Sequence, residues 1–422
     1  MIGEAGESGR ASRPAAGVAT GRRPWLGRHV VLGITGGIAA YKFVQLARDL
    51  ARYGAIVDVV MTQAAREFVG PISFEAVTGR PVLSGILDQG HALDHIRLAR
   101  DAHAVCIAPA TADFIARAAM GRSDDLLAAI LLATRAPVLI CPAMNDNMWA
   151  HEQTQTNVVR LRQLGYSIVG PATGPLAFGE GVGPGRAEEP DAVLEHIGRA
   201  LGAEPEWAGR RVVVTAGPTR EAVDPVRVLS NRSSGRMGFA IAAAAWRRGA
   251  DVLLIAGPTQ ADPPHGPRFH RIETADEMAT AVGDAVVSAD VLIMAAAVAD
   301  FRPAAPATDK IRKAEAPAAL SLEPTPDVLR TTRDRRRSGA IMVGFALETG
   351  DGRDHARAKL RDKGLDLIVL NAADEPGSGF DVDTNRVTLI DASSEEALPL
   401  MPKDDVADAL LDRVRTRLDG RS

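Results

Sequence analysis

The sequence contains little of what membrane-spanning, disulfide-rich or nucleic-acid-binding proteins need. Aromatic residues make up 4% of the 422 residues, there are two cysteines, and no apolar run is long enough to cross a bilayer. The formal net charge of −4 argues against a surface for nucleic acid. Cys106 and Cys141 both lie in apolar runs, which predicts buried, reduced thiols and does not support a zinc site. We therefore expect no membrane and no nucleic-acid partner.

A targeting segment is also missing from the start of the sequence. Residues Met1–Pro24 contain no apolar stretch of the kind found in signal peptides, and they are rich in Gly, Ala and Ser. Such a segment buries too little apolar surface to become ordered, so we expect residues 1–27 to be a disordered tail. The missing signal also favours a cytoplasmic location.

The rest of the chain has the composition of an α/β protein. It is 46% hydrophobic and contains 40 glycines, and short β-branched runs alternate with segments of helical periodicity. This alternation predicts two doubly wound parallel-sheet domains, at 28–201 and 210–422, joined by a polar linker at 202–209. The expected strands are His29–Ile34, Ala55–Met61, Ala104–Ala108, Val138–Cys141, Val212–Thr215, Asp251–Ile255, Val291–Ala295, Ile341–Val343 and Leu367–Leu370.

The carboxyl ends of the strands in the first half carry small and hydroxylated residues. Open backbone amides and small side chains suit a phosphate and a flat heteroaromatic ring, and no acidic residue stands ready for a dinucleotide ribose. This pattern favours FMN over NAD as the cofactor. The candidate cofactor-binding residues are Gly36, Gly37, Ile38, Thr62, Ala110 and Thr111.

Three further candidates have ordinary structural interpretations as well. His95 is either a catalytic or a structural histidine, and Asn145 is either a ligand contact or the N-cap of a helix. The stretch Val212–Gly238 runs from an apolar strand through a Gly-Pro break to Ser233-Ser234-Gly235 at the start of an Ala-rich helix. Backbone amides at such a start can bind phosphate, but an ordinary strand-to-helix loop fits equally well.

Four ordered motifs in the first half carry a family resemblance. They are GITGGIAAYK at Gly33–Lys42, HIRLA at His95–Ala99, APATADFIAR at Ala108–Arg117 and PAMNDNMW at Pro142–Trp149. This half resembles the flavin-dependent phosphopantothenoylcysteine decarboxylases, which have a flavodoxin-like fold. The resemblance implies FMN bound between subunits of a trimer, with His95 at the flavin and Asn145 on the substrate carboxylate. The flavin would accept electrons from the cysteine thiol and so permit loss of CO2.

One segment departs from that family's pattern. The family's flap resembles A-C-G-x-x-G-x-G-R-M, whose cysteine donates a proton, whereas residues 177–187 read AFGEGVGPGRA and are one residue longer. Phe178 or Gly179 stands in the place of the cysteine, depending on the alignment, and neither can donate a proton. Three outcomes stay open: a scaffold that binds FMN poorly, a reaction that stops at the enethiol, or another donor such as Glu180, Cys141 or water.

The second half resembles the phosphopantothenate–cysteine ligases, so the chain from about Arg28 resembles the bifunctional coenzyme A biosynthesis proteins. Its matching motifs are AGPTREAVDPVR, SNRSSGRMG, AAAVADFRP, KIRK, TPDVL, VGFALET and KLRDK, at 216–227, 230–238, 295–303, 310–313, 325–329, 343–349 and 359–363. The resemblance implies a Rossmann-like fold that joins 4′-phosphopantothenate to cysteine through an acyl-cytidylate made from CTP. Mg²⁺ would share the charge of the triphosphate, but its protein ligands are unknown.

The same resemblance assigns roles to individual residues of the ligase half. Asn231 would stabilise the acyl-cytidylate, and Lys310 would act on the phosphates. The residues implied for CTP binding are Ala296, Asp300, Lys310, Pro326, Asp327, Val328, Leu329, Phe345, Lys359 and Lys363. Homo-oligomers are implied, with trimers through the first domain and dimers through the second. Two alternatives remain: a ligase with an impaired decarboxylase domain, and a flavodoxin-like subunit in which neither half is catalytic.

Overall fold

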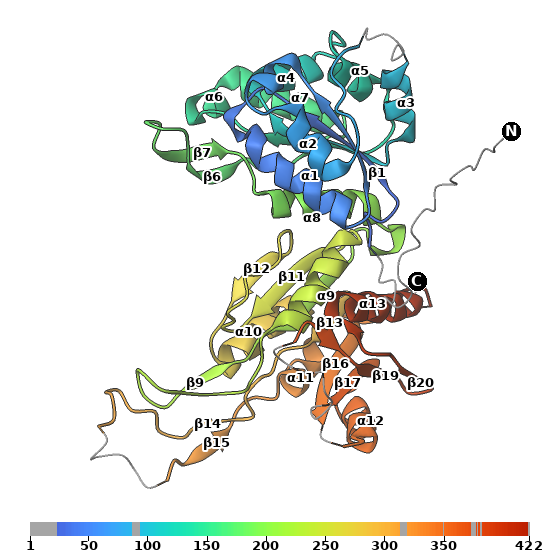
Figure 1. Ribbon diagram of the computed structural model, residues 1–422. Helices are drawn as coiled ribbons and strands as arrows, with labels where there is room; N and C mark the ends of the chain where they lie inside the picture. Colours follow the sequence, from blue (N-terminus) through green and yellow to red (C-terminus); the bar gives the residue numbers. More distant parts are fainter. Residues whose placement is uncertain are drawn as a thin grey trace, which may run out of the picture.

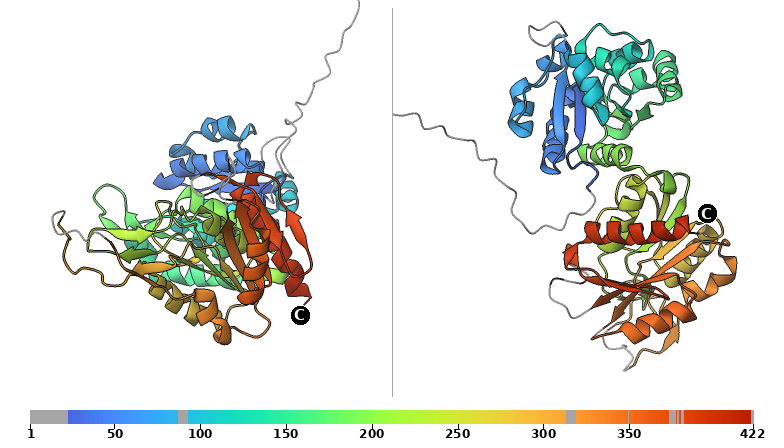
Figure 2. Two further views of the ribbon diagram at one scale, coloured as in Figure 1. Left: turned by 90° about the horizontal axis from the view of Figure 1, so that it is seen from below. Right: turned by 90° about the vertical axis from the view of Figure 1, so that its right-hand side faces the viewer.

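The computed structural model describes residues 23–86, 93–312, 319–348, 350–372, 377, 379 and 382–420. They form two α/β bodies stacked one above the other, with the first half of the sequence in the upper body and the second half in the lower body (Figures 1 and 2). The predicted fold of two doubly wound parallel sheets is confirmed, with antiparallel additions described below. Residues 1–22 of the expected tail lie outside the described residues.

The first body is built on a five-stranded parallel sheet. Its strands are β1 (His29–Ile34), β2 (Ile56–Met61), β3 (Ala104–Ala110), β4 (Val138–Pro142) and β5 (Ser167–Ile168). Their order is β2-β1-β3-β4-β5, so the chain reverses its direction of travel between β1 and β3. In doubly wound sheets a ligand site forms at this point, beyond the carboxyl ends of the strands.

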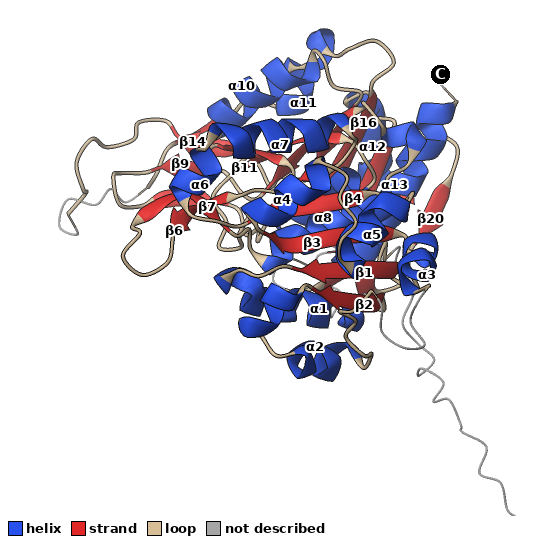
Figure 3. Ribbon diagram, turned by 90° about the horizontal axis from the view of Figure 1, so that it is seen from above, coloured by secondary structure: helices blue, strands red, loops and turns tan. Residues whose placement is uncertain are grey.

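Helices cover both faces of this sheet (Figure 3). On one face α1 (Phe43–Arg52), α2 (Pro71–Thr78) and α8 (Pro190–Gly202) bury their apolar sides, and on the other α3 (Asp94–Asp101), α4 (Ala112–Ala119), α5 (Leu126–Ala133) and α7 (Glu152–Gln163) do so. The helix expected from Ala39 begins as a 3-10 turn, η1 (Ile38–Lys42), and the segment after Thr62 is a second 3-10 turn, η2 (Gln63–Glu67). Both turns start at the carboxyl edge of the sheet.

The second body is built on an eight-stranded sheet. Its strands are β8 (Arg211–Ala216), β11 (Asp251–Ala256), β12 (Arg268–Arg271), β13 (Val291–Met294), β16 (Ile341–Glu348), β17 (Leu367–Ala372), β19 (Val387–Ile390) and β20 (Glu395–Ala397). The order is β12-β11-β8-β13-β16-β17-β19-β20, and only the last two pairings are antiparallel. One face is covered by α9 (Arg236–Arg247) and α13 (Lys403–Asp419), the other by α10 (Ala275–Val286), α11 (Val328–Thr331) and α12 (Arg353–Asp362).

Three two-stranded ribbons project from the bodies. The first body carries β6 (Ala172–Pro175) and β7 (Val182–Arg186), and the second carries β9 (Arg220–Ala222) with β10 (Val228–Ser230) and β14 (Phe301–Pro303) with β15 (Leu322–Pro324). The ribbon of β14 and β15 and strand β9 extend away from the large sheet on the same side (Figure 1). A small pairing of β18 (Thr384–Asn385) with β21 (Met401–Pro402) precedes α13.

The two bodies contact each other through α8 and α9. Arg199 of α8 donates to the carbonyls of Gly249 and Ala250, each at 3.0 Å, and to that of Trp246, at the carboxyl end of α9. Within 202–209, Trp207 is fully buried in the core of the second body. Trp25 is 5% exposed and lies under the Arg247 guanidinium. Among the described residues, none of the helices is long and apolar enough to span a membrane.

Candidate active sites

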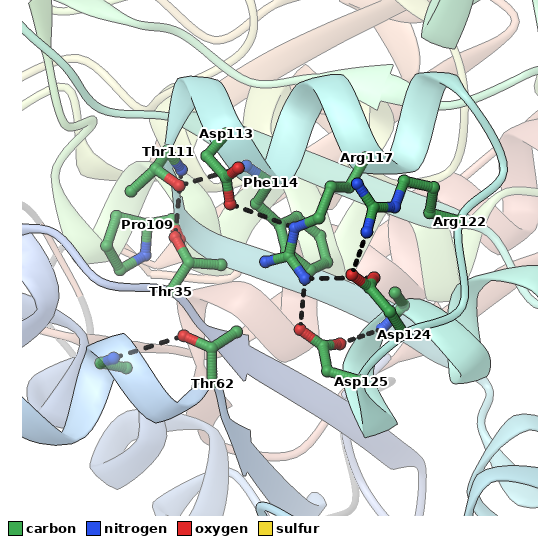
Figure 4. A network of polar contacts seen from close by, with 12 residues as sticks. Thr35, Thr62, Pro109, Thr111, Asp113, Phe114, Arg117, Arg122, Asp124 and Asp125 are labelled. Carbon is green, nitrogen blue, oxygen red and sulfur yellow. Dashed lines mark hydrogen bonds and ion pairs between the residues drawn. The ribbon is translucent and has the colours of Figure 1, made fainter. Parts of the chain in front are cut away.

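The carboxyl edge of the first sheet is organised around Thr35. This residue follows β1, is 1% exposed, and donates its hydroxyl proton to the carbonyl of Pro109 at 2.7 Å. The same hydroxyl accepts a hydrogen bond from the Thr111 amide at 3.0 Å (Figure 4). Thr35 therefore ties the ends of β1 and β3 together at the point where the strand order reverses.

The loops beside Thr35 begin short helical segments with small residues. Thr62 and Thr111 each cap the following helix by accepting a backbone N–H, from Ala65 and Phe114 respectively. A Cβ atom on Gly36 would lie 2.5 Å from the Ala64 side chain, so only glycine fits there. Backbone amides at two adjacent helical starts and small side chains form an edge that can take a phosphate and a flat ring.

Asn145 and the β6–β7 hairpin lie at the same edge. Asn145 caps the short helix α6 (Asp146–Ala150) by accepting the Asn147 amide at 2.9 Å, and its own amide nitrogen has no partner among the described residues. The Gly185 carbonyl accepts the Met144 amide at 3.0 Å. A Cβ atom on Gly185 would lie 2.4 Å from the Met144 carbonyl oxygen. The hairpin, called the flap from here on, is thus seated on the segment that carries Asn145.

Phe178 lies at the tip of the flap and is fully exposed. The tip is closed by hydrogen bonds from Leu176 N to Gly181 O and from Glu180 N to Ala177 O, both 3.0 Å. Glu180 is exposed on the same tip. Within the tip, Glu180 is therefore the side chain that can supply a proton.

His95 is not brought to this edge. It lies on α3, which packs against α5, whereas α6 and the flap lie at the opposite side of the body (Figures 1 and 3). The Nδ1 atom of His95 is buried and has no hydrogen-bond partner in the described part of the chain. Within one chain, the two residues proposed for decarboxylation, His95 and Asn145, belong to different regions.

Cys141 is not placed to act as the missing donor. Cys106 and Cys141 are fully buried free thiols, 3.9 Å apart, in the core packed beneath α1 and α8. The hydrogen bond to Cys106, together with burial, raises the pKa of the Cys141 thiol well above its ordinary value. The expectation of buried reduced thiols agrees with this geometry, and the alternative that Cys141 donates a proton is wrong because its thiol faces the core.

The second body contains a cavity of about 570 Å³ at the carboxyl ends of its central strands. Residues from nine separate parts of the chain line it, which explains why no single motif defined the site. It brings together ten of the residues predicted for the ligase: Asn231, Ala296, Asp300, Pro326, Asp327, Val328, Leu329, Phe345, Lys359 and Lys363. The amino end of α9, from Gly235 onward, forms another part of the wall.

The two cavity lysines predicted to bind CTP already have partners. Lys359 donates to the Phe345 carbonyl at 2.7 Å, and Lys363 pairs with Asp327 at 3.1 Å. Burial, and then the charge of Lys363, lower the pKa of Lys359. Burial acts to raise the pKa of Asp327, but the hydrogen bond and charge of Lys363, with the Arg330 amide and charge, outweigh it, so the pKa is lowered. An anion bound here would find two ammonium groups held on neighbouring turns of α12 and its C-terminus.

The amide nitrogen of Asn231 forms hydrogen bonds within the protein. Its Nδ2 donates to the carbonyls of Val298, at 3.0 Å, and Ala297, at 3.4 Å. The Oδ1 atom has no partner among the described residues. Asn231 therefore holds the segment between β13 and β14 while its carbonyl oxygen stays available to a ligand.

Lys310 does not line the cavity. It is exposed on the segment between β14 and β15, and its neighbour Ile311 is held by Asp224 and Arg227. Asp224 accepts the Ile311 amide at 3.2 Å, and Arg227 donates to the Ile311 carbonyl at 2.5 Å. The structure thus separates Lys310 from the other predicted CTP contacts.

Several cavity residues had no predicted role. Asn371, Asn385, Lys403 and Arg236 also line it, and Lys403 donates to the Gly379 carbonyl at 2.9 Å. Asn371 directly follows the predicted strand Leu367–Leu370, and that position was a usable signal in a doubly wound sheet. Asn385 ends β18 and Lys403 follows β21, two strands that the sequence pattern did not reveal, so no signal marked these residues. Among the described residues no cluster of three His, Cys, Asp or Glu side chains could hold a metal.

Sequence profiles of two protein families match the chain. The profile described as "Flavoprotein" matches residues 20–202, and the one described as "DNA/pantothenate metabolism flavoprotein C-terminal domain" matches residues 207–418. Together they cover both bodies.

Relatives match nearly the full length. The coenzyme A biosynthesis bifunctional protein CoaBC of Vibrio cholerae is 43% identical over 396 residues, which is 93% of this chain and 99% of the relative. The protein of the same name from Mycobacterium tuberculosis strain H37Rv is 45% identical over 411 residues, 94% of this chain and 98% of the relative. A crystal structure of the C-terminal domain of a CoaBC protein covers 51% of this chain and all of that domain, at 36% identity and a TM-score of 0.44.

Proposed function

Since the chain belongs to the family of the coenzyme A biosynthesis bifunctional proteins, we propose that it carries out two consecutive steps on 4′-phosphopantothenate. The second body joins the substrate to cysteine at the expense of CTP. The first body then decarboxylates the resulting phosphopantothenoylcysteine to phosphopantetheine with FMN. The observation that carries the ligase assignment is the single cavity that unites Asn231, Asp300, Lys359 and Lys363.

The residues of the cavity suit activation of a carboxylate by a nucleotide. A carboxylate resists attack by an amine until one of its oxygens belongs to a good leaving group, and formation of an acyl-cytidylate with release of pyrophosphate supplies that group. Lys359 and Lys363 would exchange their protein partners for phosphate oxygens, and Mg²⁺ would enter as the complex with CTP. Asp300 and the backbone of Ala296 would contact the nucleotide, and the side-chain amide of Asn231 would bind the acyl intermediate.

The ligase assignment is tested by following pyrophosphate. The purified full-length chain should release pyrophosphate only when CTP, Mg²⁺ and 4′-phosphopantothenate are all present, and CMP should follow when cysteine is added. Lys359→Ala should reduce the rate by at least about a hundredfold, because the positive charge that would stabilise the phosphates in the transition state is lost. Lys42→Ala, which removes a lysine of the first body, is the control. Absence of pyrophosphate release by the wild-type chain would refute the ligase proposal.

The edge of the first sheet fits FMN. The fit rests on the cap hydroxyls of Thr62 and Thr111, on Gly36, where a Cβ atom has no room, and on the helical starts beside them. Gly37, Ile38 and Ala110 complete the proposed cofactor-binding set. When bound, FMN would take two electrons from the substrate thiol and return them as a hydride to the enethiol that remains after CO2 is lost, so the overall reaction would be redox-neutral. The chain's own contribution is to hold the substrate carboxylate through the amide of Asn145 and to cover the site with the flap.

Proton supply in the first body falls to the flap tip. Phe178 has no proton to give and Cys141 faces the core, so we assign proton donation to Glu180 or to water beside it. This assignment keeps the full reaction to phosphopantetheine within the chain. Glu180→Gln should therefore slow phosphopantetheine formation while the flavin spectrum stays unchanged.

Flavin binding is tested separately from turnover. The full-length chain should acquire the absorbance of bound flavin with FMN, and Gly36→Val should abolish it because the added side chain overlaps Ala64. Gly70→Val, at a glycine of the first body with φ −67° whose added Cβ would meet only the Ile72 side chain at 3.9 Å, controls for the substitution itself. Equal flavin binding by both variants would contradict the placement of the cofactor.

A second copy would complete the decarboxylase site. His95 and Asn145 lie on opposite sides of one body, so a site that uses both needs His95 from a neighbouring copy. We therefore retain the proposed trimer of first domains, with dimers of second domains. We place the assembly in the cytoplasm because its relatives are biosynthetic enzymes.

A further inference from the structure

We infer that Thr219 is a positioning residue for CTP, acting together with Thr325 through the backbone of Ala299. The inference rests on the proposed ligase function. Thr219 Oγ1 accepts the Ala299 amide at 3.0 Å, and Thr325 Oγ1 donates to the Ala299 carbonyl. The Thr325 amide also donates to the Asp300 carbonyl at 3.0 Å. Two hydroxyls from separate motifs thus hold the residue that precedes Asp300.

The segment that contains Ala299 and Asp300 lies between two strands and belongs to neither of them. Strand β13 ends at Met294 and β14 begins at Phe301, so the backbone of 295–300 must find partners elsewhere. Thr215 Oγ1 accepts the Ala296 amide at 3.1 Å, the Ala297 amide donates to Gly217 O at 2.9 Å, and Asn231 donates to the Val298 carbonyl. Side chains and loops outside the segment therefore fix its path.

Thr219 acts behind the cavity and not in it. Residues 294–300 line the cavity, whereas Thr219 is fully buried and is absent from the lining. Its hydroxyl therefore reaches a nucleotide only through the backbone of Ala299 and the side chain of Asp300. Displacing a contact by about 1 Å can weaken an active-site interaction a hundredfold, so a lost bond at Ala299 should be felt at Asp300.

Three variants of Thr219 and Thr325 test this inference in the full-length chain. Thr219→Val keeps the shape of the side chain and removes the acceptor, Thr219→Ser keeps the hydroxyl, and Thr325→Val removes the donor on the other side. We expect Thr219→Val and Thr325→Val to raise the KM for CTP about tenfold, with the KM for cysteine unchanged. Thr219→Ser should restore the KM for CTP to near the wild-type value.

A double-mutant cycle with Asp300 distinguishes a positioning role of Thr219 from a general loosening of the structure. In an Asp300→Ala background, Thr219→Val should raise the KM for CTP no further, because the residue it positions is gone. Thr280→Val, which removes a hydroxyl bonded to the Asp276 carbonyl in α10, should leave the KM unchanged. Thermal unfolding of each variant identifies any that fail to fold, and the Ser and Thr325 variants then carry the test.

The outcomes distinguish the inference from the proposed function. An unchanged KM for CTP in Thr219→Val, or an undiminished effect in the Asp300→Ala background, would overturn the positioning role while the ligase proposal stands. If the wild-type chain releases no pyrophosphate from CTP, the proposed function itself fails. In that case, calorimetry would still show whether Thr219→Val raises the Kd for CTP.

Discussion

Asn231 meets two demands with one side chain. Its Nδ2 donates to the Val298 and Ala297 carbonyls, and its Oδ1 is left to a ligand. We predict that Asn231→Asp lowers the ligation rate on the order of a hundredfold, because a carboxylate would face two carbonyl oxygens and repel a negatively charged intermediate. The thermal midpoint should hardly move, since Asn231 is exposed. Rapid-quench detection of the acyl-cytidylate measures the effect, and wild-type rates would refute the role.

Phe178 offers the sharpest test of the flap. A thiol at this fully exposed tip would restore a proton donor, so we predict that Phe178→Cys raises the rate of phosphopantetheine formation about tenfold. Phe178→Ser, similar in size and without an acidic thiol, is the matched control and should match the wild type. Equal rates for the Cys variant and the wild type would mean that the proton already comes efficiently from elsewhere.

Single residues were predicted best where a motif coincided with a strand end. Thr62, Thr111, Ala296 and Asp300 follow strands whose apolar runs are plain in the sequence. Lys310 shows the limit of prediction from motifs. It lies on a long connection between two strands, and a basic motif does not indicate where such a connection runs in the fold. His95 is similar: its position depends on the packing of α3 against α5, which a local pattern does not encode.

At the scale of elements, the flap depends on a glycine at its root. Gly185 has φ 125°, and a Cβ atom there would lie 2.4 Å from the Met144 carbonyl oxygen. We predict that Gly185→Ala lifts β7 from the segment carrying Asn145 and slows decarboxylation about tenfold.

Gly179 provides the matched control for that substitution. It has φ 86° and an added Cβ would meet nothing within 4 Å, so Gly179→Ala carries the backbone strain without the overlap. Phosphopantetheine formation by the two variants gives the comparison. If both variants slow the reaction equally, the contact of the flap with Met144 does not determine the rate of decarboxylation.

The major elements were predictable and the ribbons were not. The β-branched runs and helical periods gave the central strands of both sheets, because such strands are buried on both faces and read as continuous apolar segments. The flap strands contain Gly and Pro at several positions, and β9, β10, β14 and β15 are three residues each, too short to show alternation. The antiparallel strands β19 and β20 were missed for the same reason.

For the whole molecule, the joint between the bodies includes a histidine that must stay neutral. His196 of α8 stacks edge-on against Trp246 of α9 at 5.0 Å, and burial, followed by the charges of Arg199 and His265, lowers its pKa to about 4. An unfolded histidine titrates near 6.5, so unfolding takes up a proton below that pH. Stability from this group is complete above about pH 6.5 and is lost as the pH falls towards 4.

The expected size of this effect is about 2 kcal/mol at pH 5 relative to pH 7.5, from the two pKa values. Urea unfolding of the wild type and of His196→Gln at both pH values isolates it, because the variant keeps every other titrating group. The wild type should lose more stability on acidification than the variant. Identical pH dependence would show that the imidazole is not held neutral at the joint.

The joint itself could not be predicted from the sequence. Trp25 falls in a segment expected to be a tail, and Trp207 in one expected to be a polar linker, yet both are buried. Each lies beside charged or turn-forming residues, so a local reading of composition favours exposure. Trp25 packs in the core of the first body beside α8, and Trp207 packs in the core of the second body beside α13, so both are covered by elements distant in the sequence.

One incubation tests whether a single chain performs both steps. The purified full-length protein, loaded with FMN, is given 4′-phosphopantothenate, cysteine, CTP and Mg²⁺, and the products are identified by mass spectrometry alongside a pyrophosphate assay. We predict that phosphopantetheine and pyrophosphate form in equal amounts. Accumulation of phosphopantothenoylcysteine or of the enethiol, without phosphopantetheine, would contradict the assignment of both activities to this chain.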